Sequence, residues 1–222
     1  MKKVALIVAG GKGIRMGSKI PKQFLILKEL PILMHTIKLF SDFEKIFLVL
    51  PSSEFKYWET LCEKYNFKVD HVLVNGGESR FHSVKNGLNK IDNESVVAIH
   101  DGVRPLVSKK LISTLISKTK TGIGMIPIIP IKDSIRKVEG KKSISIKRNN
   151  LYRIQTPQCF LSSDIKDAYK QKFSQKFTDD AIVLENNGGK IKTILGEEKN
   201  IKITTKKDLI VAKNLCYNRN FL

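Results

Sequence analysis

Short apolar runs alternate along the chain with segments in which apolar residues recur at helical spacing. The runs are VALIVA (4–9), KIFLVLP (45–51), HVLVN (71–75), SVVAIHD (95–101) and GIGMIPIIP (122–130). The segments between them, 31–41, 54–65, 79–91 and 107–119, each place apolar side chains on one face. Continuous apolar runs are typical of parallel strands that are buried on both faces. The alternation therefore predicts a single doubly wound, Rossmann-like α/β domain of residues 1–222 with a mainly parallel sheet.

Residues 131–155 break this alternation. They read IKDSIRKV, EGKK and SISIKRNNLYRI, two alternating stretches around a tight turn. The segment is too polar for a hairpin inside the core, so we expect a projecting β-arm, and such arms often clasp a second subunit. Beyond the arm the α/β pattern resumes, with helices near 162–172 and 178–187, a strand over 190–195 and a closing helix near 205–214.

The first apolar run ends at a glycine-rich loop that carries several cations, GGKGIRMGSKIPKQF (10–24). The loop fits neither the G-x-G-x-x-G dinucleotide fingerprint, whose third glycine is misplaced, nor the Walker A pattern G-x-x-x-x-G-K-[ST]. Glycines let the main chain approach phosphates and turn its N–H groups toward them. The Arg15 guanidinium can hold two oxygens at once, and Lys22 supplies a compact charge. We therefore expect this loop to stabilise a phosphoryl group in its transition state.

The informative polar segments follow strands. GGKG follows the first apolar run, NGGES the third and HDGVRP the fourth. Ligands of doubly wound sheets bind beyond the carboxyl ends of the strands. These segments are therefore expected to meet at one site, with Ser79 as the N-cap of the helix that follows NGGES.

The formal net charge of +19 raises the possibility of nucleic-acid binding. The excess is mostly lysine, however, and the lysines are spread over the whole chain instead of forming one tract. Proteins that read base edges and phosphates favour arginine in clustered patches. A lysine-rich surface that steers a polyanionic small substrate is the favoured interpretation.

The three cysteines, Cys62, Cys159 and Cys216, are widely spaced and form no C-x-x-C pair. They predict neither a zinc site nor a disulfide framework. No apolar run reaches the roughly 18–20 residues that span a bilayer, and the first run is too short for a secretory signal. We expect a cytoplasmic protein with no membrane and no nucleic-acid partner.

A resemblance to a known family covers nearly the whole chain. VAGGKGIRMGSKIPKQF resembles the signature of nucleotide-sugar-type pyrophosphorylases. Further segments narrow the resemblance: NGGESRFHSVKNGL (75–88), HDGVRPLV (100–107), PIKDSI (130–135), LYRIQTPQCF (151–160), TDDA (178–181) and NIKITTKKDL (200–209). Together and in this order, they are similar to the motifs of the 2-C-methyl-D-erythritol 4-phosphate cytidylyltransferases of the non-mevalonate isoprenoid pathway.

The resemblance implies transfer of a cytidylyl group from CTP to a polyol phosphate, whose phosphate oxygen attacks the α-phosphorus while pyrophosphate leaves. It assigns stabilisation of this transition state to Arg15 and Lys22. It assigns positioning of the substrate phosphate to Arg148 and Lys202. Mg²⁺ is expected to bridge the triphosphate oxygens because hard cations prefer oxygen ligands. Asp101 is the expected carboxylate near this ion or the substrate.

The resemblance also implies two sets of binding residues and a homodimer. Residues expected to contact CTP are Ala9, Gly10, Gly11, Asn75, Gly77, Glu78 and Ser83. Residues expected to contact the second substrate are Arg104, Ser134, Arg148, Thr156, Thr178 and Lys202. In the family the arm reaches across a dimer, so each site would borrow residues from the neighbouring chain.

Two alternatives stay open on the sequence. A ribitol-5-phosphate cytidylyltransferase shares the glycine loop and the TPQ stretch, although RNNLYRIQTPQ is closer to the methylerythritol enzymes. A basic nucleic-acid-binding module would show steeply salt-dependent binding to DNA or RNA and no release of pyrophosphate.

Overall fold

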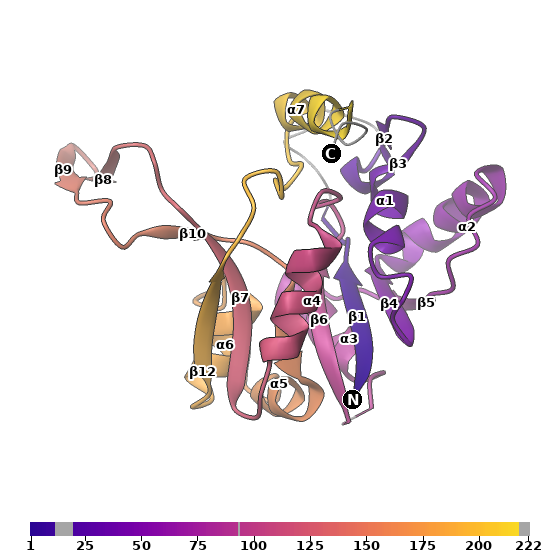
Figure 1. The fold of residues 1–222 in the computed structure, drawn as a ribbon, viewed down its shortest axis with the longest axis horizontal. Helices are drawn as coiled ribbons and strands as arrows, with labels where there is room; N and C mark the ends of the chain where they lie inside the picture. Colours follow the sequence, from indigo (N-terminus) through magenta and orange to yellow (C-terminus); the bar gives the residue numbers. More distant parts are fainter. Residues whose placement is uncertain (12–19, 93, 218–222) are drawn as a thin grey trace.

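The computed structural model describes residues 1–11, 20–92 and 94–217. Its centre is one mixed sheet, drawn in Figure 1, that contains strands from nearly the whole length of the chain. The parallel strands are β1 (Lys2–Val8), β4 (Lys45–Leu50), β5 (Val72–Asn75), β6 (Ser95–Asp101), β7 (Ile123–Pro130) and β12 (Lys190–Leu195). β1 lies between β4 and β6, and β12 pairs in parallel with β7. The prediction of a mainly parallel sheet is confirmed.

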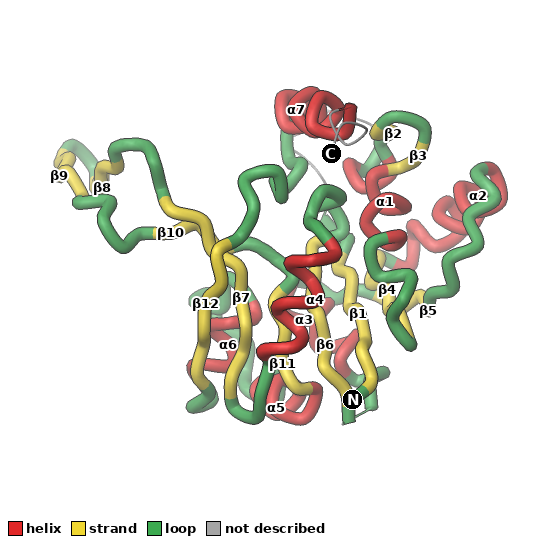
Figure 2. The backbone as a smooth tube through the Cα atoms, viewed as in Figure 1, coloured by secondary structure: helices red, strands yellow, loops and turns green. Residues whose placement is uncertain are grey.

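Helices cover both faces of this sheet (Figure 2). They are α1 (Ile32–Lys38), α2 (Phe55–Lys64), α3 (Arg80–Leu88), α4 (Lys109–Lys118), α5 (Ser162–Ala168), α6 (Asp180–Asn186) and α7 (Lys206–Tyr217). Within β1, Ala5 and Ile7 pack with α1, α2 and α4, whereas Val4 and Leu6 pack with α3, α5 and α6. Because strand side chains alternate between faces, one continuous apolar run supplies two cores.

Side chains cap several of these helices. The hydroxyl of Ser79 accepts a hydrogen bond from His82 N at the start of α3, which confirms the predicted N-cap. Ser108 caps α4 and Asp179 caps α6 in the same way. Each cap satisfies a backbone donor that has no partner within the helix, so these loops are fixed where they leave the carboxyl edge of the sheet.

Two short antiparallel strands, β10 (Tyr152–Ile154) and β11 (Gln158–Leu161), were not predicted. β11 runs between β6 and β7 and is antiparallel to both. Its four residues are too few for a periodicity to emerge, and its first side chain, Gln158, is a fully buried polar group. The small ladder of β2 (Ile26–Leu27) with β3 (Leu30–Pro31) was missed for the same reason of length. Two 3₁₀ turns, η2 (Lys22–Phe24) and η3 (Ser52–Glu54), complete this half of the chain.

The expected arm is present as a hairpin of β8 (Ile135–Glu139) and β9 (Lys142–Ile146). Gly140 has a φ of 57°, which suits the first central position of a two-residue hairpin turn. The hairpin projects well away from the sheet (Figure 1), and its Val138 and Ile144 side chains are 65% and 59% exposed. The presence of the projecting arm is confirmed, whereas its contact with another subunit stays a prediction.

A third apolar cluster packs α7 against the loops at the carboxyl end of the sheet. Leu27 from β2, Val103 from the loop after β6, and Ile203 pack with Ala212 and Cys216 of α7. Ile203 N also donates to Val103 O at 2.9 Å. The loop that precedes α7 is therefore fixed beside the loop that follows β6. No helix of the described residues is both long and apolar enough to cross a membrane.

Candidate active site

A cavity of about 280 Å³ opens at the carboxyl ends of β1 and β6. It brings together nine of the residues singled out from the sequence, namely Ala9, Gly10, Gly11, Lys22, Gly77, Glu78, Ser83, Asp101 and Lys202. These residues come from segments separated by up to almost the whole chain length. The expectation that the polar segments after the strands meet at one site is confirmed.

A second cavity of about 230 Å³ adjoins the first. Arg104, Thr156 and Thr178, which the family resemblance assigns to the second substrate, line this cavity. Arg80, Asp101 and Lys202 line both cavities. Most residues of the two predicted binding sets therefore line two adjoining spaces that meet at a charged boundary.

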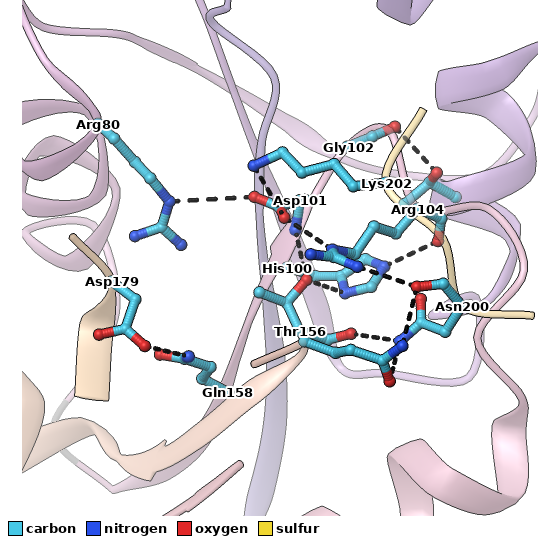
Figure 3. A network of polar contacts seen from close by, with 12 residues as sticks. Arg80, His100, Asp101, Gly102, Arg104, Thr156, Gln158, Asp179, Asn200 and Lys202 are labelled. Atoms are coloured by element: carbon cyan, nitrogen blue, oxygen red, sulfur yellow. Dashed lines mark hydrogen bonds and ion pairs between the residues drawn. The ribbon is translucent and has the colours of Figure 1, made fainter. Parts of the chain in front are cut away.

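Asp101 lies at this boundary with three cations around its carboxylate (Figure 3). Arg104 Nε is 2.8 Å and Lys202 Nζ is 3.2 Å from Asp101 Oδ2, and Arg80 Nε is 4.0 Å from Oδ1. Burial alone would raise the pKa of this carboxyl, but the charges of Lys202, Arg80 and Arg104 outweigh it and hold the pKa well below its usual range. Asp101 is therefore ionised at neutral pH, and it holds three cationic side chains together at the boundary of the two cavities.

A buried hydrogen-bond network orients the loop after β6. Asp101 N donates to Thr156 Oγ1 at 3.0 Å, and Thr156 Oγ1 lies 2.9 Å from His100 Nδ1. His100 Nε2 lies 3.0 Å from Arg104 O. This pattern fits a neutral imidazole that accepts from the threonine hydroxyl and donates to the carbonyl. Burial lowers the pKa of His100 to about 4, so the ring is structural and uncharged at neutral pH.

Asn200 anchors the loop that carries Lys202. Its side chain is fully buried and donates through Nδ2 to Thr156 O at 2.9 Å. Its backbone carbonyl accepts from Arg104 Nη1 at 2.9 Å and from Gln155 Nε2 at 3.2 Å. These bonds fix the backbone two residues before Lys202, and they explain how a lysine that is distant in sequence reaches Asp101.

Lys22 and Gly77 shape the first cavity. The side chain of Lys22 lies over Gly11, where an added Cβ would be 3.7 Å from its Nζ. Gly77 N donates to Ser83 Oγ at 3.1 Å, which ties the turn after β5 to α3. A cation over a glycine backbone and a tight turn therefore both line this cavity. This arrangement suits a ligand that carries phosphates and a flat ring.

Three predicted residues lie away from these cavities, and one lies outside the described residues. The side chain of Asn75 accepts a hydrogen bond from Ser52 N at 2.9 Å and does not line either space. Ser134 is exposed at the base of the arm, and Arg148 donates there to Lys132 O. Arg15 is the residue outside the described part of the chain. The isolated chain therefore does not bring Ser134 or Arg148 to the cleft.

Arg80 and its buried partner Asp180 were not predicted as site residues from the sequence. The Arg80 guanidinium makes two hydrogen bonds to Asp180, of 2.7 and 2.6 Å, and Asp180 is fully buried at the start of α6. Asp180 belongs to the TDDA motif, but nothing in the motif shows which cation it pairs with. Gln158, which accepts from the backbone of Asp180 and Ala181, was missed for the same reason.

The doubly wound sheet and the cationic side chains beyond its strand ends are typical of α/β proteins whose ligands are anionic and bind at this edge of the sheet. The sequence profile of 2-C-methyl-D-erythritol 4-phosphate cytidylyltransferase matches residues 3–217. The chain belongs to this family. The assignment favours the methylerythritol enzymes over the two alternatives that the sequence left open, a ribitol-5-phosphate cytidylyltransferase and a nucleic-acid-binding module.

Individual relatives and solved structures agree with this assignment. The chain is 47% identical over 219 residues to the 2-C-methyl-D-erythritol 4-phosphate cytidylyltransferase of Azobacteroides pseudotrichonymphae, covering 96% of this chain and 98% of the relative. It is 44% identical over 218 residues to the one of Bacteroides fragilis, covering 97% and 100%. Among structures, the enzyme of Francisella tularensis gives a TM-score of 0.79 at 33% identity, covering 96% and 98%, and that of Thermus thermophilus gives 0.81 at 26%, covering 98% and 100%.

Proposed function

We propose that this protein transfers the cytidylyl group of CTP to 2-C-methyl-D-erythritol 4-phosphate. The products are 4-diphosphocytidyl-2-C-methyl-D-erythritol and pyrophosphate. The observation that carries the proposal is the pair of adjoining cavities, which share Arg80, Asp101 and Lys202 at their boundary. Two substrates that react phosphate to phosphate require two spaces that meet at a cationic boundary.

The reaction is an in-line displacement. A phosphate oxygen of the polyol phosphate forms the new bond to the α-phosphorus of CTP, and the bond from that phosphorus to the bridging oxygen of pyrophosphate breaks. A phosphate monoester is already nucleophilic near neutral pH, so the step needs no general base. Negative charge builds up on the α-phosphate, and fixed cations that face it lower the barrier. We assign this role to Lys22 and Arg15.

The remaining assignments follow the two cavities. Ala9, Gly10, Gly11, Gly77, Glu78 and Ser83 hold CTP in the first cavity, and Asn75 supports the turn that carries Gly77. Arg104, Thr156 and Thr178 contact the polyol phosphate in the second. Lys202 at the boundary positions the attacking phosphate, together with Arg148 and Ser134 of a second subunit.

Mg²⁺ is the proposed cofactor. The described residues contain no group of three or more histidine, cysteine, aspartate or glutamate side chains that could hold a metal ion. Asp101 Oδ2 is already in contact with Arg104 and Lys202, so this carboxylate offers at most Oδ1 to an ion. This donor set fits a Mg²⁺ ion that is held mostly by the triphosphate itself. When bound, the ion neutralises charge on the phosphates.

A homodimer explains why two of the proposed substrate contacts lie on the arm. Arg148 and Ser134 belong to the projecting arm, and the exposed Val138 and Ile144 give it an apolar surface that a second chain can cover. A cytoplasmic location, the absence of nucleic-acid partners and the single-domain organisation stay predictions.

The deciding experiment measures pyrophosphate release by the purified protein with CTP, 2-C-methyl-D-erythritol 4-phosphate and Mg²⁺. We expect turnover with this pair of substrates, with ATP, GTP and UTP much slower and with chelated metal inactive. Ribitol 5-phosphate is the matched second substrate. Faster turnover with ribitol 5-phosphate, or none with either polyol phosphate, would overturn the proposal.

A further inference from the structure

Arg80 is held rigidly at the boundary between the two cavities. Its Nη1 and Nη2 atoms bind the two carboxylate oxygens of Asp180 at 2.7 and 2.6 Å. Tyr169 Oη donates to the same carboxylate at 2.6 Å. A guanidinium that is fixed through two parallel hydrogen bonds has a defined plane and orientation.

The edge of Arg80 that does not face Asp180 points toward Asp101. A guanidinium has five N–H donors, and the two bonds to Asp180 use one donor on each terminal nitrogen. The remaining edge includes Nε–H, and Nε lies 4.0 Å from Asp101 Oδ1 (Figure 3). This separation is too long for a hydrogen bond. Among the described residues, no other group pairs with this nitrogen or with Asp101 Oδ1.

The gap between Arg80 Nε and Asp101 Oδ1 has the dimensions of one bridging hydroxyl group. An oxygen about 2.8 Å from each atom can accept from Nε–H and donate its own proton to the carboxylate. A phosphate oxygen fits poorly, because it would meet the ionised Asp101 at hydrogen-bond distance without a proton to share. A hydroxyl satisfies both sides.

We propose that Arg80 and Asp101 together form a clamp for one hydroxyl group of a substrate, and that Arg80 is thereby a specificity-determining residue. Since Arg80 lines both cavities, the hydroxyl belongs either to the ribose of CTP or to the polyol chain. The inference rests on the proposed function, because that function supplies the two hydroxyl-bearing substrates. Asp180 acts through Arg80 by fixing its orientation.

The test combines Arg80→Lys with substrates that each lack one hydroxyl: 2′-deoxy-CTP, 3′-deoxy-CTP and deoxy analogues of the polyol phosphate. In the unmodified protein, the analogue that lacks the clamped hydroxyl should lose roughly ten- to a hundredfold in kcat/KM. In Arg80→Lys, kcat/KM for the same analogue should be less than about threefold below that for the complete substrate. The reason is that the guanidinium that binds the hydroxyl is already absent. If the loss shrinks in Arg80→Lys for a deoxy-CTP, the clamped hydroxyl belongs to the ribose. If it shrinks for a deoxy polyol phosphate, the clamped hydroxyl belongs to the polyol.

Tyr169→Phe is the matched control, because it removes one hydrogen bond from the same buried carboxylate and leaves Arg80 in place. It should show the full loss with the analogue. If every analogue loses as much kcat/KM in Arg80→Lys as in the unmodified protein, the clamp is wrong. The clamp is also wrong if Tyr169→Phe reduces the loss for the analogue as much as Arg80→Lys does.

A second measurement needs no substitution. In structures of the unmodified protein with CTP and with the polyol phosphate, one ligand hydroxyl oxygen should lie within about 3.2 Å of Arg80 Nε. No hydroxyl within about 3.5 Å in either complex would refute the clamp even if Arg80→Lys does not fold. The failure of the proposed function is a separate result, since it appears as a lack of turnover with the complete substrates.

Discussion

Lys202 and Asp101 form an ion pair across the boundary of the two cavities, with 3.2 Å between Nζ and Oδ2. Asp101 ends β6, whereas Lys202 lies in the loop between β12 and α7. Asp101 Oδ2 also pairs with Arg104 Nε at 2.8 Å, so a substitution of Lys202 leaves the carboxylate a second cationic partner. The ion pair connects the loop that carries Lys202 to the end of β6.

Lys202→Ala should lower kcat/KM for the polyol phosphate by about a hundredfold and change the Kd of CTP little, because it removes a charged contact to one substrate only. Steady-state kinetics and nucleotide titration measure the two effects. Lys199→Ala, an exposed lysine of the same loop, is the control and should behave like the unmodified protein. A CTP affinity that falls as much as kcat/KM would place Lys202 in the nucleotide site instead.

Lys22→Ala should reduce kcat by about two to four orders of magnitude and leave KM nearly unchanged, because a cation that acts in the transition state does little for ground-state binding. Arg15→Ala carries the same expectation. Lys118→Ala, at an exposed position of α4, controls for the loss of one positive charge. An effect confined to KM would show that Lys22 binds the ground state only.

Mixing two inactive variants should restore activity if the arm completes a neighbouring site. Lys22→Ala damages the cleft and Arg148→Ala damages the arm. In an equal mixture that exchanges subunits, half of the dimers are mixed, and each mixed dimer has one intact site, so about a quarter of the original activity should return. Sedimentation verifies that both variants are dimeric. Activity that stays at the level of the separate variants would mean that each chain completes its own site.

The stability of the protein should fall between about pH 6.5 and pH 4 because of His100. Burial lowers the pKa of this ring to about 4 in the folded protein, whereas the unfolded chain takes up the proton near pH 6.5. Between these two pH values His100 is protonated in the unfolded chain but not in the folded protein. The free energy of unfolding therefore drops by about 3 kcal/mol over this range and then levels off. Urea unfolding at several pH values measures this.

His100→Gln is the matched variant, since its amide can still donate to Arg104 O. It lacks the titrating ring but keeps the other three histidines. Its stability should therefore depend less on pH in this window than that of the unmodified protein. Identical pH profiles for the two proteins would contradict the assignment.

Gly77→Ala should destabilise the protein and weaken CTP binding. An added Cβ would lie 2.5 Å from His82 Cβ and 3.1 Å from His82 C, so α3 must shift. A shift of this kind costs about 1–3 kcal/mol, which corresponds to a decrease in Tm of about 3–10 °C for a domain of this size. Gly10→Ala has space, with its nearest contact at 3.8 Å, and should keep its Tm. Equal Tm values for Gly77→Ala and the unmodified protein would show that the turn adapts.

Local patterns in the sequence determined the parallel part of the sheet, the helices, the cap at Ser79 and the arm. They succeed because apolar periodicity records which face of an element is buried, and because a cap or a two-residue turn depends only on neighbouring residues. The predicted strands also locate the carboxyl ends of the sheet. This is why the sequence could predict that Gly77 and Asp101 lie at one edge of the sheet.

Only the tertiary structure decided the pairing of charges and the insertion of β11 between β6 and β7. Arg80 lies a hundred positions from Asp180, and Lys202 a comparable distance from Asp101. Neither pair produces a recurring residue spacing in the sequence, because an ion pair depends on where packed elements meet and not on the spacing within one element. β11 pairs with two strands through backbone hydrogen bonds, which any sequence can form, so its position depends on the packing of the elements around it.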